Sequence, residues 1–92
     1  MLKKMIVDGR WGIHAEVAAR LYEVSRRRES CHIFIKHGRK IASLMDISQL
    51  LALGVKQGDE IVVIADGEDE AGAIREVISV IQHTSRGCRN IL

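Results

Sequence analysis

The sequence feature that most constrains the fold is an amphipathic segment late in the chain. Apolar residues recur there at intervals of three and four: Ala71, Ile74, Val77, Ile78 and Ile81. This spacing places the apolar side chains on one face of an α-helix. A helix with a single apolar face needs a second layer to cover that face. We expect the helix to end near Thr84 and residues 85–92 to form a flexible tail.

The pattern of the remaining apolar residues predicts that the second layer is a β-sheet. Residues 2–7 read as a first strand, and residues 30–37 alternate between apolar and polar side chains, as a half-buried strand does. A turn at Gly38 joins that strand to a short one at residues 40–43, which predicts a hairpin. Residues 61–64 are apolar on both faces, which favours a central strand.

Two more helices are predicted between these strands. Residues 15–27 carry apolar side chains at helical spacing, and Asp46 is a strong N-cap for a short second helix. We expect the buried stripe of that second helix to consist of Ile47, Leu50 and Leu51, and Gly54 to be its C-cap. The predicted class is therefore α+β, with one sheet, helices on one face and a single domain over residues 1–84.

Composition narrows the classes of function. The chain has 92 residues, a net charge of +2, and one residue each of Phe, Tyr and Trp. Near-neutral charge and few aromatics argue against a nucleic-acid-binding protein. We interpret the arginines 26–28 as a solvated face at the end of a helix.

With no signal-peptide pattern and no apolar run of about 20 residues, we expect a soluble cytoplasmic protein without membrane insertion. We expect Cys31 and Cys88 to be reduced thiols.

His14 is the candidate functional residue, since it stands where a strand has ended and a helix is about to begin. The first amides of a helix have no acceptor within it, and the helix dipole adds positive charge there. Both effects stabilise an anion such as phosphate. An imidazole at this point can take a phosphoryl group on a ring nitrogen while the amides of Ala15, Glu16 and Val17 bind its oxygens.

The alternative is that His14 is an ordinary structural or solvated histidine, because four histidines occur in the chain. His32, His37 and His83 lack any helix-start context, and we interpret them in that way. Histidine and cysteine are not grouped at the spacing of a zinc site, so we predict no metal.

A resemblance to a known family rests on the segment around His14 and on the element order. The segment Gly12-Ile13-His14-Ala15, followed by Ala18-Ala19, resembles the active-site segment of HPr, the histidine-containing phosphocarrier of the bacterial sugar phosphotransferase system. The hairpin at Gly38, residues 47–54, the acid-rich residues 67–71 and the last helix fall at family-like intervals, so the resemblance covers nearly the whole chain. It implies an open-faced β-sandwich of order β-α-β-β-α-β-α. Its antiparallel four-stranded sheet would carry three helices on one face.

The resemblance also implies a role and partners. His14 matches the histidine that accepts a phosphoryl group from Enzyme I, which takes it from phosphoenolpyruvate, and passes it to a sugar-specific Enzyme IIA. No cofactor is implied. We expect Ile47 and Leu51 to belong to an apolar surface that docks onto these partners.

The sequence departs from the family pattern beside His14. The pattern has Arg then Pro after His-Ala, where this chain has Glu16 and Val17. A carboxylate about 4 Å from a phosphoryl group costs about 1 kcal/mol in water and more in a partly desolvated site. Arg10 or Arg20 is a candidate for the missing cation. Alternatively, Glu16 simply favours the start of the helix and points to solvent.

A second departure concerns regulation. In Gram-positive members of the family a serine at a helix start is phosphorylated by a kinase, and the modified protein binds a catabolite-control repressor. Counting back from Gly54 places Asp46 at that position, whereas Ser43 and Ser48 align only with a shift. Asp46 either imitates part of a phosphoserine's charge or serves as an N-cap alone.

Two functions remain open from the sequence. One is a phosphocarrier that uses His14. The other is a regulatory protein that has lost efficient transfer and binds a transcriptional regulator or another protein. A hydrolytic enzyme is disfavoured because no triad or paired carboxylates can be placed near His14.

Overall fold

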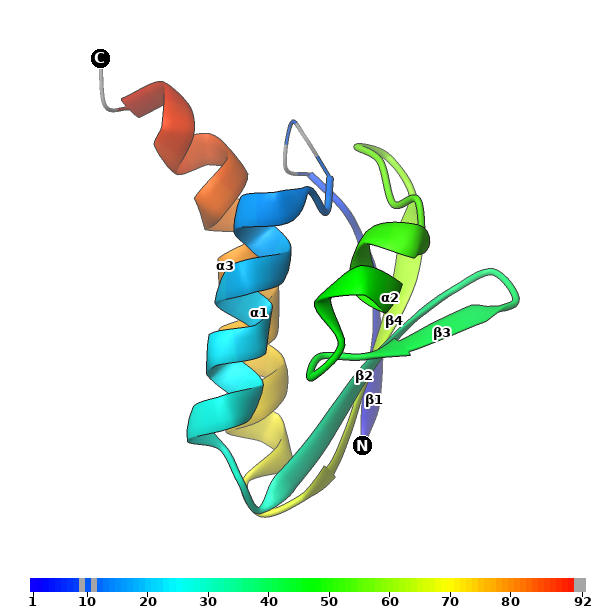
Figure 1. Ribbon diagram of the computed structural model, residues 1–92, viewed down its shortest axis with the longest axis vertical. Coiled ribbons are helices and arrows are strands. Elements are labelled where there is room, and N and C mark those ends of the chain that lie inside the picture. Colours follow the sequence, from blue (N-terminus) through cyan, green and yellow to red (C-terminus); the bar gives the residue numbers. More distant parts are fainter. Residues whose placement is uncertain (9, 11, 91–92) are drawn as a thin grey trace.

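Seven elements follow one another in the computed structural model (Figure 1): β1 (Leu2–Ile6), α1 (Ala15–Arg27), β2 (Cys31–His37), β3 (Lys40–Ser43), α2 (Ile47–Ala52), β4 (Glu60–Gly67) and α3 (Glu70–Asn90). The order is the predicted one. The structure describes residues 1–8, 10 and 12–90, and for residues 84–90 it describes the backbone alone. Trp11 and residues 91–92 therefore lie outside its description.

The four strands form one antiparallel sheet in the order β1-β4-β2-β3. β4 is central, as its apolar sequence predicted. It is longer than the predicted residues 61–64, because it continues through Asp66 to Gly67. Gly67 pairs with Cys31. Its φ is 140°, and a Cβ there would overlap the carbonyl oxygen of Ser30, so only glycine permits this last pairing.

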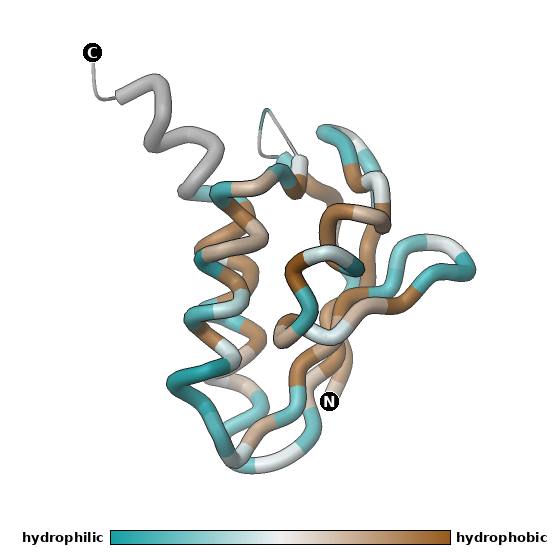
Figure 2. The backbone as a smooth tube through the Cα atoms, viewed as in Figure 1, coloured by the Kyte–Doolittle hydropathy of each residue, from teal (hydrophilic) through white to brown (hydrophobic). Residues whose placement is uncertain are grey.

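All three helices cover one face of the sheet, with α1 and α3 side by side (Figure 1). Burial alternates along the strands, since Ile33 and Ile35 are buried while their neighbours face outward. The core is almost entirely aliphatic, as the scarcity of aromatics required. Figure 2 shows apolar residues gathered along the strands, whereas the β2–β3 hairpin tip and the turn after α1 are hydrophilic.

The burial of α2 differs from the prediction. Leu50 is fully buried, but Ile47 and Leu51 keep 36% and 41% of their surface exposed. The expected stripe of Ile47, Leu50 and Leu51 is thus wrong for two of its members. Leu50 and Leu53 form the row that faces the core, and Ile47 and Leu51 lie about a quarter-turn around the helix from it. A helix of six residues buries only one row.

α3 also differs at its end. We expected it to stop near Thr84, but its backbone remains helical to Asn90. Nothing in residues 85–90 stops a helix outright, because a single glycine there costs only about 1 kcal/mol and proline is absent from the chain. The flexible tail that we predicted for residues 85–92 includes residues outside the described part and stays a prediction.

Candidate functional site

His14 is the N-cap of α1. Its backbone is extended, with φ −110° and ψ −175°, and its carbonyl oxygen accepts from the amide of Ala18 at 2.8 Å. The imidazole Nδ1 accepts from the backbone amide of Glu16 at 3.2 Å. The imidazole thus caps the helix, a role that serine or aspartate has at most helix starts. This contact holds Nδ1 against the first turn of the helix.

The second ring nitrogen of His14, Nε2, differs from Nδ1 in burial and in hydrogen bonding. Nε2 is buried and has no hydrogen-bond partner among the described residues. Because Nδ1 accepts a hydrogen bond in the neutral ring, the proton lies on Nε2. A reactant can therefore approach Nδ1 from the helix-start side, whereas Nε2 is closed to it.

The loop before His14 is held by the segment that follows α2. The amide of Ile13 donates to the carbonyl oxygen of Val55 at 3.2 Å, and Ile13 is 6% exposed. Gly12 has a φ of 64°, and a Cβ at that position would overlap the same carbonyl oxygen. Glycine is needed here both for its backbone conformation and for the close approach of two chain segments. The structure thus brings the start of α1 next to the end of α2.

The start of α1 is suited to an anion. The amides of Ala15, Glu16 and Val17 belong to its first turn and have no acceptor within the helix. One of them contacts Nδ1, and the helix dipole adds partial positive charge. Oxygens of a group bonded to Nδ1 would meet these amides.

The charged side chains near His14 lie on both sides of this point. Glu16 and Arg20 form an ion pair across one helical turn, with Nη2 of the arginine 3.6 Å from Oε2 of the glutamate. Both side chains are well exposed, at 47% for Glu16 and 61% for Arg20. Arg10 has an exposed side chain in the loop before Gly12.

α2 presents the other predicted site residues. Oδ1 of Asp46 accepts from the amide of Gln49 at 3.1 Å, which confirms the predicted N-cap. Ile47 and Leu51 are exposed on this helix, which packs against α1. The C-cap of α2 is Leu53 and not Gly54, the residue that we expected; Gly54 comes one residue later with a φ of 67°, the left-handed conformation that commonly follows a C-cap.

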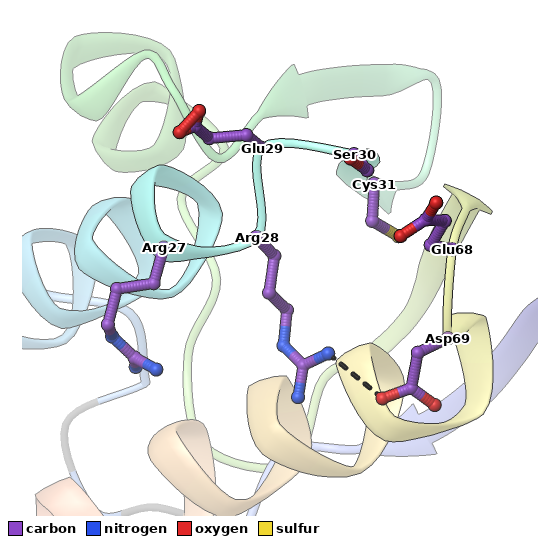
Figure 3. A pocket seen from close by; sticks show the side chains of 7 residues that line it. All are labelled: Arg27, Arg28, Glu29, Ser30, Cys31, Glu68 and Asp69. Carbon is purple, nitrogen blue, oxygen red and sulfur yellow. Dashed lines mark hydrogen bonds and ion pairs between the residues drawn. The ribbon is translucent and has the colours of Figure 1, made fainter.

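A second cluster, which the sequence pattern did not reveal, lies at the other end of α1. Side chains of this cluster line a cavity of about 350 Å³ (Figure 3): Arg27, Arg28, Glu29, Ser30, Cys31, Glu68 and Asp69. Arg28 bonds Asp69 at 3.2 Å, and both Arg27 and Arg28 bond Glu76 of α3, at 2.6 and 2.8 Å. Our interpretation of arginines 26–28 as a solvated face is therefore wrong for Arg28, whose side chain is only 25% exposed, whereas Arg27 remains 59% exposed although it pairs with Glu76.

These ion pairs lower the pKa values of the carboxylates that take part in them. Hydrogen bonds from Arg27, and then from Arg28, hold the pKa of Glu76 below its usual range. The hydrogen bond from Arg28 lowers the pKa of Asp69, and the amide of Gly72 adds to this effect. Since the cations are already matched by carboxylates, the cavity offers no uncompensated positive charge to an anionic ligand. We interpret the cluster as a link between α1 and α3.

The described residues hold no group of three or more side chains that could bind a metal ion. Cys31 is a free, buried thiol, while the side chain of Cys88 lies outside the description. Among the helices of the described part, none is both long and apolar enough to cross a membrane.

The fold and the site together define a class: small α+β proteins in which a histidine caps a helix whose first amides point at its ring. Residues 2–83 match the family described as "PTS HPr component phosphorylation site". The chain belongs to the HPr family of the bacterial phosphotransferase system.

Known relatives agree with this assignment. A curated relative, the phosphoryl donor subunit DhaM of the PEP-dependent dihydroxyacetone kinase from Providencia stuartii (strain MRSN 2154), is 31% identical over 78 residues. That match covers 85% of this chain but only 16% of DhaM, so the chain spans a small part of that protein.

Solved structures share the fold. The phosphocarrier HPr of Bacillus anthracis superposes with a TM-score of 0.81, covers 89% of this chain and 96% of its own, and is 23% identical, which bears on the fold alone. Crh, a catabolite repression protein of Bacillus subtilis, has a TM-score of 0.70 and 28% identity over 88% of this chain and 92% of its own. The predicted open-faced sandwich is confirmed.

Proposed function

We propose that the chain is a cytoplasmic phosphocarrier in which His14 accepts a phosphoryl group from an Enzyme I-type donor and passes it to an Enzyme IIA-type acceptor. The observation that carries the proposal is the orientation of the imidazole. Nδ1 faces the first amides of α1, while Nε2 is buried without a partner among the described residues. No cofactor is needed, because the phosphoryl group itself is the cargo.

The transfer step follows from this orientation. The lone pair of Nδ1 leaves the amide of Glu16 and attacks the phosphorus atom. A nitrogen–phosphorus bond forms as the bond to the donor breaks, and the donor keeps that electron pair. The amides of Ala15, Glu16 and Val17 then bind the phosphoryl oxygens. The ring keeps its proton on Nε2, so it gains positive charge, and in a buried site without an acceptor that charge favours onward transfer.

The cation that this chemistry needs is assigned to Arg10 or Arg20. Arg20 stands one turn along α1 and already contacts Glu16, the residue whose amide is bonded to Nδ1 of His14. Arg10 stands in the loop on the other side of His14. Either guanidinium would offset the carboxylate of Glu16 and bind phosphoryl oxygens with two donors.

The first experiment measures label transfer from phosphoenolpyruvate through purified Enzyme I. We expect acid-labile label on the wild type and none on His14→Ala, since the acceptor nitrogen is gone. His83→Ala is the matched control, because that histidine is exposed on α3, and it should be labelled like the wild type. Equal labelling of His14→Ala and the wild type would refute the proposal.

Partner docking is assigned to the exposed apolar residues of α2, Ile47 and Leu51, which lie on the helix that packs against α1. We predict that Leu51→Asp raises the KM for the donor protein about tenfold, as loss of an apolar interface contact does. The unfolding midpoint should barely change, because Leu51 is 41% exposed. Leu2→Asp is the control: it changes an exposed apolar residue on β1, the edge strand opposite β3 in the sheet, and should leave KM unchanged. Similar KM changes in both variants would speak against docking through α2.

A second candidate function is regulatory binding to a transcriptional regulator without transfer. It is favoured by Glu16 beside His14, by Asp46 at the family's serine position and by the likeness to Crh. The two functions differ in whether binding of a catabolite-control regulator depends on Asp46. If Asp46→Asn abolishes that binding while Asp46→Ser retains the fold, the regulatory function gains support. If both variants bind as the wild type does, Asp46 is only a cap.

A further inference from the structure

Glu16 adjoins the ring nitrogen that a transfer partner must reach. It is the second residue of α1, its amide is bonded to Nδ1 of His14, and its side chain is 47% exposed. A protein that exchanges a phosphoryl group with Nδ1 therefore covers this carboxylate.

The charge of Glu16 constrains what that partner can present. An acidic group of the partner beside Glu16 would bring three negative groups together: that acid, the carboxylate of Glu16 and the phosphoryl group. Like charges opposed across an interface cost several kcal/mol, because docking expels the water that screens them. A basic side chain of the partner would satisfy the carboxylate and the phosphoryl oxygens together.

The ion pair between Glu16 and Arg20 is easily exchanged. It spans 3.6 Å, and both side chains are exposed. Such pairs between residues four apart on a helix are worth only about 0.3–0.5 kcal/mol. Within this pair, a cation from the partner can thus replace Arg20 at little cost and leave the guanidinium of Arg20 to the phosphoryl group.

We propose that Glu16 sets partner specificity, and that the cognate donor and acceptor proteins carry a basic side chain opposite the first turn of α1. This inference rests on the proposed phosphocarrier function. An Enzyme I whose own carrier has arginine at this position, as the family pattern implies, cannot carry a basic group there, because it would face a like charge. This chain should be a poor substrate for such an enzyme.

The test uses, as the phosphoryl donor, an Enzyme I whose own carrier has arginine at the position of Glu16. Initial rates are measured for the wild type, Glu16→Gln and Glu16→Arg, with circular dichroism to show that α1 is intact. We expect Glu16→Arg to raise kcat/KM about tenfold or more, mainly through KM, and Glu16→Gln to lie between. The gain should shrink as salt is raised from 50 to 500 mM, because salt screens the contact.

Glu23→Arg is the matched control. Glu23 is an acid on the same helix, bonded to Arg26 at 3.1 Å and remote from His14. It undergoes the same charge reversal and should leave kcat/KM unchanged. Equal rates for the wild type and Glu16→Arg would overturn the inference, and so would an equal gain in Glu23→Arg. Absence of label on His14 in every folded variant would instead overturn the phosphocarrier function itself.

Discussion

At the scale of residues, the position of the His14 ring depends on backbone that precedes it. Gly12 brings the loop against the carbonyl oxygen of Val55, and Ile13 bonds that same oxygen. His14 then starts the helix with its own side chain as the cap. The ring is thus held by a chain segment about 40 residues away in sequence, since residue 55 stands opposite residue 13.

We predict that Gly12→Ala lowers the free energy of unfolding by more than 2 kcal/mol, because left-handed strain and overlap with Val55 add together. Gly38 has nearly the same φ, 60° against 64°, but nothing within 4 Å of an added Cβ. Gly38→Ala should therefore cost only the strain, about 1 kcal/mol. Urea unfolding of both variants measures the difference. Equal losses would show that the close approach to Val55 contributes nothing.

At the scale of elements, α1 and α3 are joined at one end by charge as well as by apolar packing. Glu76 accepts hydrogen bonds from two consecutive arginines, and its side chain is only 27% exposed. The link is at the opposite end of α1 from His14. It therefore stabilises the helix pair without entering the site.

We predict that Glu76→Gln lowers the free energy of unfolding by about 1 kcal/mol near pH 7, since a partly buried charged pair is lost. The pKa of Glu76 is lowered in the folded protein, so its contribution is present above the ordinary glutamate value and disappears as the pH falls through the lowered pKa. Urea titrations from pH 7 down to pH 3 should show the wild type and the variant converging. Glu23→Gln, which breaks an exposed pair on α1, should change little at any pH. A difference for Glu76→Gln that is constant with pH would contradict this account.

At the scale of the whole molecule, the sheet is covered on one side only. Adjacent residues of β2 therefore have different roles: Ile33 is 1% exposed in the core, while Phe34 stands on the open face opposite Ile64 and Ser43. Because one face of the sheet is open, the core and the site both lie on the face that the helices cover.

We predict that Ile33→Ala costs about 3 kcal/mol, as removal of a buried aliphatic side chain does. Phe34→Ala should cost about 1 kcal/mol, the range of a cross-strand pair on an exposed face, although phenylalanine is the larger residue. Chemical denaturation of the two variants under one condition gives the comparison. A greater loss for Phe34→Ala would mean that the open face is covered in solution.

Element order and type could be read from the sequence because the apolar periods are local and strong. α1 and β3 have the predicted bounds, and the cap at Asp46 follows from a single residue type. The predictions were wrong where contacts between segments distant in sequence determine burial or the length of an element. Ile47 and Leu51 are exposed because the core contacts only one row of a short helix, and β4 runs on to Gly67 because Cys31 lies opposite.

By itself, the sequence determined the class of fold, the helix start at His14 and the unusual carboxylate beside it. These depend on spacing and residue type along one stretch of chain. The tertiary structure alone decided which ring nitrogen faces the amides, which segment holds Gly12 and which arginines join α3. Each of these depends on groups far apart in sequence, and only packing of the folded chain brings such groups within hydrogen-bond distance.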